Sequence, residues 1–274
     1  MTVTIPPFPY LRELVLTRSG VLLSDEQEYL LEARLAPLAR ELGFGSGADV
    51  VEAVRQDGNG TLSARVVEAM VTGETSWFRD SHPFEIIKTS VLPEVIAANH
   101  VERALSVWSA ACSTGQEIYS IAMILDTFFP ETAEWKLRLV GTDLSSSAVS
   151  RAREGIFSSL EMNRGLPAMM LAHYFEREGA KFRIADSIRN KVRFDTLNLV
   201  SDWLPPSTFD IVLLRNVLIY FDIPLKKQVL AGVWSRVARG GFLFLGATET
   251  ALGLGEDLVP THRDGVTYYR KGTN

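Results

Sequence analysis

Ser106-Val-Trp-Ser-Ala-Ala-Cys-Ser-Thr-Gly-Gln-Glu-Ile-Tyr119 is the stretch of sequence that decides the fold of this chain. It opens with a short, mostly apolar run from Val107 to Ala111 and continues through the small polar residues Ser113-Thr-Gly-Gln. An apolar segment from Ile118 to Phe129 follows, long enough for about three helical turns. This order predicts a strand, a tight loop and a helix.

Such a loop indicates a ligand site, because it brings the backbone amides and the positive end of a helix close to a bound molecule. The stretch contains neither the G-x-G-x-x-G dinucleotide fingerprint nor the G-K-[ST] ending of a phosphate-binding P-loop. Glu117, in the first helical turn, would repel a pyrophosphate but suits a cation such as the ammonium of a methionine moiety. Dinucleotides and ATP are therefore disfavoured.

A second strand is predicted for Arg138-Leu-Val-Gly-Thr-Asp143, where Asp143 lies 28 residues after Gly115. In nucleoside-binding α/β folds, an acid at the end of the second strand accepts hydrogen bonds from ribose hydroxyls. The loop and the acid together favour an adenosyl ligand without phosphates, and S-adenosylmethionine fits that description. The alternative is a doubly wound domain in which Asp143 only caps the next helix, near Ser145-Ser-Ser.

Composition excludes several classes of protein. The chain has 274 residues, and 46% of them are hydrophobic. Its net charge of −5 argues against general nucleic-acid binding, which requires a basic surface to neutralise phosphates. Its single cysteine, Cys112, rules out a disulfide framework and is expected to be a small buried residue. The four histidines show no metal-ligand spacing, so no metal is expected. Without a signal peptide or an apolar run of about 18 residues, we expect a soluble, cytoplasmic protein that does not insert into membranes.

Two domains are predicted, a helical domain over residues 1–73 and a ligand-binding domain over residues 74–274. The first shows helical spacing of apolar residues, a capping box at Ser24-x-x-Gln27, and Pro37, which should kink or end its helix. Further short helices are expected near 48–56 and 61–71. The second domain alternates strands and helices, which predicts a doubly wound, mostly parallel sheet. Residues 1–71 carry 6 Arg and 10 acidic residues, a net charge of −4, so this domain is no general clamp for an acidic partner.

An antiparallel β hairpin, inserted at about 178–195, is predicted from the alternation of apolar residues between Lys181 and Phe194. Its outward positions would form a basic face: Lys181, Arg183, Arg189, Lys191 and Arg193. Two interpretations are open, a solvated edge strand protected by charge or a docking surface for an acidic partner.

Three further segments bear on the ligand. Thr72-Gly-Glu-Thr-Ser-Trp-Phe-Arg-Asp80 is either interdomain packing or a lid whose Thr75 and Arg79 face the cofactor. Asn198 and Leu199 end a strand with a polar and an apolar side chain, suited to the edge and face of an adenine. The buried strand that begins at Phe209 delivers Asn216 and Tyr220 to the carboxyl rim, where open parallel sheets bind ligands.

Together these blocks resemble the chemotaxis receptor methyltransferase (CheR) family, cytoplasmic enzymes that methylate glutamate side chains of bacterial chemoreceptors with S-adenosylmethionine. The resemblance covers nearly the whole chain. The blocks that carry it, in order, are Ser19-Gly-Val-x-Leu with Tyr29-Leu-Leu-x-x-Arg-Leu35, Thr75-x-x-Phe-Arg79, Trp108-Ser-Ala-Ala-Cys-Ser-Thr-Gly-Gln-Glu-x-Tyr-Ser120, Thr142-Asp143, Asn198-Leu199 and Arg215-Asn-Val-x-Ile-Tyr-Phe221.

The resemblance implies a class I methyltransferase-like fold and a set of cofactor contacts. These are Thr75, Arg79, Glu117, Asp143, Asn198, Leu199, Asn216 and Val217. Tyr220 would lie beside the transferring methyl, and Arg79 and Tyr220 would orient the reactants. The chain departs from the family at Gly73, where the best-known members have Asn, which puts one cofactor contact in question.

The resemblance also implies the partners, which would be the cytoplasmic helices of chemoreceptors with their methyl-accepting glutamates. The hairpin is short and lacks the Gly-rich extension of members that dock a receptor's C-terminal tether, so we expect a tether-independent enzyme and a monomer. Two other functions stay open: a methyltransferase of the same fold with another substrate, and a non-catalytic adaptor that binds the cofactor for signalling.

Overall fold

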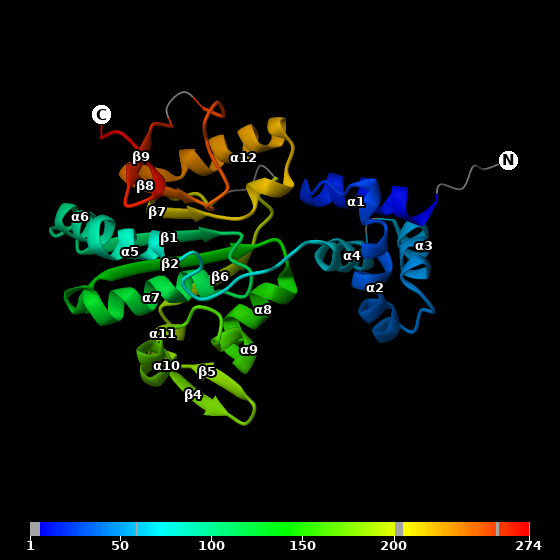
Figure 1. Cartoon of the computed structure of the whole chain (residues 1–274), viewed down its shortest axis with the longest axis horizontal. Coiled ribbons are helices and arrows are strands. Elements are labelled where there is room, and N and C mark those ends of the chain that lie inside the picture. The colour runs from blue at the N-terminus through cyan, green and yellow to red at the C-terminus, as the bar shows by residue number, and fades with distance from the viewer. Residues whose placement is uncertain (1–5, 59, 201–204, 256–257, 274) are drawn as a thin grey trace. The chain divides into compact units, whose positions relative to one another are not determined.

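A computed structural model of the chain describes residues 6–58, 60–200, 205–255 and 258–273. The chain divides into two compact units, Met1–Thr72 with Tyr220–Leu225, and Gly73–Ile219 with Lys226–Asn274 (Figure 1). The first unit ends at Thr72, and the domain boundary expected after residue 73 stays a prediction. In the described ranges, no helix is both long and apolar enough to cross a membrane.

The first unit is helical, as its sequence pattern predicted. Its elements are α1 (Pro7–Ser19), η1 (Asp25–Gln27), α2 (Tyr29–Leu42), α3 (Gly47–Asp57) and α4 (Thr61–Met70). The capping box is present, since the Ser24 amide donates to Gln27 Oε1 at 2.8 Å just before α2. Pro37 lies inside α2 and does not end it. Leu11, Leu35 and Val50 are fully buried, which is why this short unit has a core of its own.

The second unit is built on a seven-stranded sheet in the order β6-β2-β1-β7-β8-β10-β9. The strands are β1 (Ala104–Ala110), β2 (Lys136–Asp143), β6 (Val192–Thr196), β7 (Phe209–Leu214), β8 (Val237–Leu245), β9 (Pro260–Arg263) and β10 (Val266–Arg270). The first five are parallel to one another, whereas β10 pairs antiparallel with β8 and β9. The predicted doubly wound, mostly parallel sheet is confirmed.

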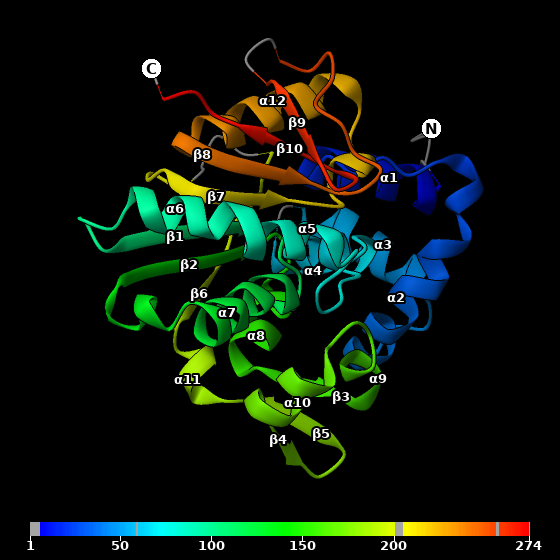
Figure 2. The ribbon, with the colours of Figure 1, turned by 60° about the vertical axis from the view of Figure 1, so that its left-hand side comes forward.

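Helices and short helical turns complete the second unit. They are α5 (His82–Ile86), η2 (Ile87–Val91), α6 (Leu92–Ala98), α7 (Gln116–Phe128), η3 (Pro130–Glu134), α8 (Ser146–Glu154), α9 (Ser159–Met162), α10 (Ala168–Tyr174), α11 (Asp186–Arg189), η4 (Leu218–Tyr220) and α12 (Ile223–Ser235), the last two crossing the division between the units. Figure 2 shows α6 and α7 on the same face of the sheet. Their apolar side chains join those of β1 and β7 in one buried cluster.

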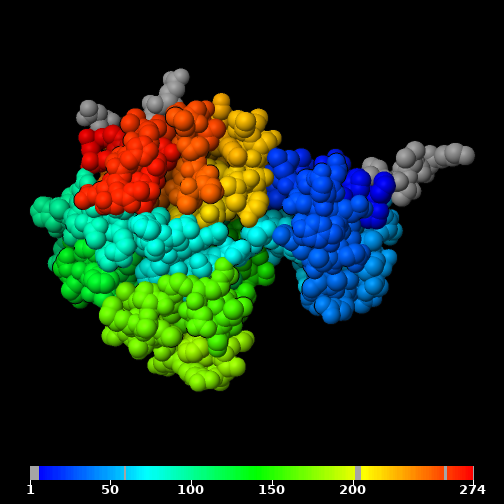
Figure 3. Space-filling view, viewed as in Figure 1, coloured from blue at the N-terminus to red at the C-terminus, as the bar shows by residue number. Residues whose placement is uncertain are grey.

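A small antiparallel sheet is inserted after α8, in the order β3-β5-β4, from β3 (Ile156–Ser158), β4 (Phe175–Glu178) and β5 (Lys181–Ile184). With its neighbouring helices it stands out from the rest of the second unit on the lower side of Figure 3. The hairpin is therefore confirmed, but its position is corrected. The hairpin strands are β4 and β5, and the residues expected as its second strand form β6, which runs parallel to β2 at the edge of the main sheet.

The basic face expected on the hairpin is also corrected, because its residues lie on β5, on α11, in the turn after α11 and on β6, and not on one hairpin. Four of the five pair with a nearby acid. The pairs are Arg183 with Glu178, Arg189 with Asp186, Lys191 with Asp126, and Arg193 with Asp195. This local neutralisation favours the solvated, charge-protected interpretation over a docking surface for an acidic partner.

Asp126 anchors the inserted segment to α7. Its carboxylate accepts a hydrogen bond from the Tyr174 hydroxyl of α10 at 2.9 Å and pairs with Lys191, next to β6. Burial opposes ionisation of this group most strongly, but the hydrogen bonds from Lys191 and Tyr174 outweigh it and hold the pKa of Asp126 below its usual range. The pair therefore stabilises the fold only while the carboxyl is ionised.

Lys191→Met is expected to lower the free energy of unfolding by about 1 kcal/mol at pH 7. The folded-state pKa of Asp126 lies below its unfolded value of about 3.9. The contribution is therefore complete above that value and is lost as the pH falls through the lowered pKa. Urea unfolding of wild type and variant from pH 7 into acid should show the difference shrinking, and a difference that stayed constant would contradict this role.

Candidate cofactor site

The predicted site residues of the second unit follow four parallel strands that end at one edge of the sheet (Figure 1). Glu117 comes after the loop that follows β1, and Asp143 is the last residue of β2. Asn198 and Asn216 follow β6 and β7, each with its apolar neighbour, Leu199 or Val217. β1 lies between β2 and β7, so the chain reverses its direction of winding here, which is where open parallel sheets bind ligands.

The loop after β1 is a tight turn with left-handed residues. Ala111, Ser113 and Gly115 have φ angles of 61°, 50° and 91°. The Cys112 amide donates to the Thr142 carbonyl at 2.9 Å, which holds the loop against the end of β2. A Cβ on Gly115 would lie 2.9 Å from the Phe194 ring, so only glycine fits there without displacing that ring.

Asp143 is oriented by two backbone amides. Its carboxylate accepts from Ser113 N at 2.7 Å and from Ser145 N at 2.9 Å. Helix α8 is capped by Ser145 itself, whose hydroxyl accepts from Ala148 N at 3.1 Å. The alternative in which Asp143 serves only as the helix cap is therefore not what the structure shows. The carboxylate instead joins the loop after β1 to the end of β2, which places it beside any ligand held by that loop.

A buried arginine, Arg215, lies at the same carboxyl edge of the sheet, which we call the rim, and binds residues on the side away from Asp143. The guanidinium of Arg215 donates to Glu117 Oε2 at 2.8 Å and to Asp80 Oδ2 at 2.7 Å, and also to the Arg79 carbonyl at 2.9 Å. Its side chain is 1% exposed. Glu117 accepts a further hydrogen bond from the Ser109 hydroxyl at 2.8 Å. One cation against two carboxylates leaves this corner with a formal charge of −1, which suits a cationic ligand group and disfavours a phosphate.

The segment from Gly73 to Ser81 is tied to the same loop. The Ser113 hydroxyl donates to the Gly73 carbonyl at 2.6 Å, and the Phe78 amide donates to the Ser120 hydroxyl at 3.2 Å. Trp77 is fully buried and packs edge-on against Phe157 within the second unit, with ring centroids 4.8 Å apart. A Cβ on Gly73 would lie 3.4 Å from the Ser113 hydroxyl, an ordinary contact, so a larger side chain could be accommodated there.

The structure gives the local surroundings of Thr75, Arg79 and Tyr220. Thr75 and Arg79 are partly buried in this segment, and the Arg79 guanidinium donates to the Glu74 carbonyl at 2.9 Å, so only its backbone is bonded to Arg215. Tyr220 belongs to the first unit, where its carbonyl accepts from the Leu22 amide at 3.1 Å. The pairing of Arg79 and Tyr220 as orienting groups stays a prediction.

Cys112 has the environment of a structural residue. Burial, reinforced by the carboxylates of Asp143 and Glu117, raises the pKa of its thiol well above the usual range. A thiol held in its neutral form is a poor nucleophile, which agrees with the small buried residue expected from the sequence. In the described ranges, no three His, Cys, Asp or Glu side chains group so as to hold a metal ion.

Sequence reasoning missed three residues of the rim: Asp80, Arg215 and Glu249, whose carboxylate accepts from the Asn216 amide at 2.8 Å. Arg215 did carry a signal, since it ends an apolar strand, and a buried arginine requires carboxylate partners. The partners themselves are 98 and 135 positions away in the chain, and no local pattern indicates them.

Comparison with known families identifies the family to which both units belong. Residues 7–71 match the family described as CheR methyltransferase, all-alpha domain, and residues 73–261 match CheR methyltransferase, SAM binding domain. The chain belongs to the CheR methyltransferase family. The rim described above therefore lies in an S-adenosylmethionine-binding domain, and the chain is a methyltransferase of this family.

Curated relatives agree with the CheR assignment. The chain is 41% identical to chemotaxis protein methyltransferase Cher2 of Pseudomonas putida over 86% of both chains. It is also 41% identical to chemotaxis protein methyltransferase 1 of Pseudomonas aeruginosa, over 84% of this chain and 85% of the relative. A chemotaxis protein methyltransferase of Vibrio parahaemolyticus is 37% identical over 87% and 86%. These likenesses span both units.

Arg215→Met is expected to lower the free energy of unfolding by about 3–5 kcal/mol, because it leaves Glu117 and Asp80 without their buried cation. Urea unfolding at pH 7 measures this loss. The matched control is Arg151→Met, whose ion pair with Glu161 has the arginine side chain 54% exposed and should cost less than about 1 kcal/mol. Equal losses in the two variants would contradict the role given to Arg215.

Proposed function

We propose that this CheR-family enzyme transfers a methyl group from S-adenosylmethionine to glutamate side chains on the cytoplasmic helices of chemoreceptors. The observation that carries the proposal is the acidic corner of the rim made by Glu117, Arg215 and Asp80, which suits a cationic cofactor group and disfavours a phosphate. The names of the relatives, all chemotaxis protein methyltransferases, support the choice of substrate.

The bound cofactor supplies a methyl group on a positively charged sulfur. Glutamate, with a reference pKa of about 4.3, is already ionised at pH 7, so the reaction needs no general base. The chain's own task is to align the carboxylate oxygen with the methyl carbon and the sulfur, and to exclude water from the anion. Charge is neutralised as the reaction proceeds, so a strong cationic clamp on the carboxylate would favour the ground state.

The residue roles follow from this chemistry. We assign cofactor contacts to Thr75, Arg79, Glu117, Asp143, Asn198, Leu199, Asn216 and Val217. Asp143 would hold the ribose hydroxyls, Glu117 the ammonium, and Asn198 with Leu199 the adenine. Arg79 and Tyr220 would orient the reactants without acting as acid or base.

The partner assignment rests on the inserted sheet and on charge. The turn between β4 and β5 consists of Gly179 and Ala180 alone, which supports an enzyme that does not depend on a receptor tether. The helical unit is net acidic, so a receptor that it contacts would present neutral or basic surface there. We further propose that the enzyme acts as a monomer in the cytoplasm.

Radiolabelled methyl from S-adenosylmethionine is expected to appear on receptor cytoplasmic fragments as glutamate methyl esters. Such esters are hydrolysed by mild base, so the label should be released as volatile methanol, and receptors with the acceptor glutamates replaced by alanine should take up none. The measurement is base-released radioactivity with and without the enzyme.

The two alternative functions give different results in that assay. Label that resists base, or that appears on another acceptor, would indicate a methyltransferase with a different substrate. Binding of S-adenosylhomocysteine without any transfer would indicate an adaptor. Asp143→Ala is the internal control, since loss of the ribose contact should abolish both cofactor binding by calorimetry and labelling.

Tyr220→Phe is expected to lower kcat for receptor methylation by about tenfold or more, with the KM for S-adenosylmethionine nearly unchanged. The variant keeps the ring and removes only the hydroxyl that would orient the reacting groups. Tyr29→Phe is the matched control, because Tyr29 lies in the same unit and is 68% exposed. Full turnover by Tyr220→Phe would remove the assignment.

A further inference from the structure

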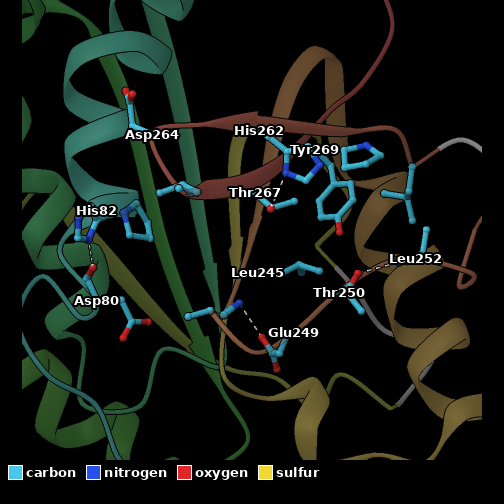
Figure 4. A pocket seen from close by; sticks show the side chains of 17 residues that line it. Asp80, His82, Leu245, Glu249, Thr250, Leu252, His262, Asp264, Thr267 and Tyr269 are labelled. Carbon is cyan, nitrogen blue, oxygen red and sulfur yellow. Dashed lines mark hydrogen bonds between the residues drawn. The ribbon is translucent and has the colours of Figure 1, made fainter.

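Glu249 closes the turn that follows β8. Its backbone amide donates to the Gly246 carbonyl at 2.9 Å, and the Gly246 amide donates back to Glu249 Oε2 at 2.7 Å (Figure 4). This reciprocal pairing resembles a capping box, in which the side chain of a glutamate accepts a hydrogen bond from the backbone amide three residues before it. The turn therefore brings the carboxylate of Glu249 to the carboxyl edge of the sheet.

The same carboxylate also holds the neighbouring strand's end. Asn216 N donates to Glu249 Oε2 at 2.8 Å, and Ile219 N donates to Glu249 Oε1 at 3.2 Å. These amides follow β7 and lie beyond the last paired residue of that strand, Leu214. One carboxylate thus accepts three backbone hydrogen bonds and joins the ends of β7 and β8.

Two local features show that the backbone is shaped around this carboxylate. Asn216 has a φ angle of 58°, a left-handed conformation that is uncommon for residues other than glycine, although asparagine adopts it more readily than most. At Gly246, a Cβ would lie 2.7 Å from Glu249 Oε2 and 2.8 Å from Asn216 N, so a side chain at this position would separate the acceptor from its donors. The hydrogen bond from the Asn216 amide to the Glu249 carboxylate stabilises this conformation.

We infer that Glu249 is a positioning residue for cofactor binding: its carboxylate fixes the turn from Asn216 to Ile219, so that Asn216 and Val217 meet the cofactor. Glu249 itself does not touch the cofactor. This inference rests on the proposed function, in which Asn216 and Val217 are cofactor contacts.

The surroundings of Glu249 make the inference testable by substitution. Its side chain lies on the wall of a cavity of about 710 Å³ formed by the start of α5, the end of β8 and the β9–β10 hairpin (Figure 4). A shorter side chain would let water from this cavity reach the three amides, so the cost in stability should be moderate. Water would not hold the turn in its left-handed conformation.

The test measures the Kd of S-adenosylhomocysteine by calorimetry for wild type, Glu249→Gln and Glu249→Ala. Glutamine keeps one acceptor oxygen and should weaken binding about threefold, whereas alanine loses all three hydrogen bonds and should weaken it at least about tenfold. In methylation assays the loss should appear as a raised KM for S-adenosylmethionine. If Glu249→Ala does not fold, the threefold weakening expected for Glu249→Gln decides the test, and a wild-type Kd in that variant would overturn the inference.

Asp210 provides a matched control at the opposite end of the sheet. Its carboxylate also accepts three hydrogen bonds, from Ser106 N at 2.8 Å, Ser106 Oγ at 2.6 Å and Asn99 Nδ2 at 3.2 Å, and joins the starts of β1 and β7. Asp210→Ala should therefore lower the thermal midpoint about as much as Glu249→Ala while leaving the Kd unchanged. Equal weakening of binding in both variants would show a general loss of stability and overturn the inference.

A second substitution tests the same contact from its other side. Gly246→Ala should weaken binding as Glu249→Ala does, and the double variant should be no worse than the more affected single variant, because both changes break one contact. Additive losses, or a folded Glu249→Ala with wild-type Kd, would overturn the positioning role while the proposed function stands. A wild type that bound no S-adenosylhomocysteine would overturn both.

Discussion

Arg215 lies buried between two carboxylates, and the geometry of the rim depends on this arrangement. A buried arginine directly after a strand is costly unless its charge is paired with carboxylates. Glu117 comes from the first turn of α7 and Asp80 from the segment before α5, so satisfying one guanidinium brings three distant parts of the chain to the same point. The arginine therefore couples the cofactor loop to the segment that carries Thr75 and Arg79.

Strained backbone conformations are concentrated in the three segments that form the rim, which are the segment before α5, the loop after β1 and the turn after β7. Among the described residues, eight non-glycine residues have positive φ, and six of them lie in the three rim segments: Phe78, Asp80, Ser81, Ala111, Ser113 and Asn216. Each such residue costs of order 1–3 kcal/mol unless its surroundings hold it. At Ser113 and Asn216 the holding group is a carboxylate, Asp143 or Glu249, that accepts the strained residue's own amide. Acidic side chains thus shape the rim's backbone as well as its charge.

Local sequence patterns predicted the helices and strands of this fold better than the contacts between residues that lie far apart in the chain. The loop after β1 was predictable because its small residues and flanking apolar runs are contiguous. The hairpin was misplaced because the alternation in Val192–Thr196 reports a strand with one exposed side, and an edge strand parallel to β2 shows the same alternation as a hairpin strand. Arg215 and Glu249 act through contacts far apart in the chain, and only the folded structure brings their partners within hydrogen-bond distance.

The charge arrangement also bears on the proposed transfer to a carboxylate. An acceptor anion and a cationic cofactor lose charge together as the methyl moves, so a fixed cation aimed at the acceptor would hold the reactants more tightly than the transition state. Arg215 is the buried cation of the rim, and its two Nη groups donate to Glu117, Asp80 and a backbone carbonyl. The positive charge of Arg215 is therefore balanced by carboxylates of the protein itself. For the proposed carboxylate acceptor, Arg215 would therefore not act as a clamp, and catalysis would depend on alignment and on the exclusion of water.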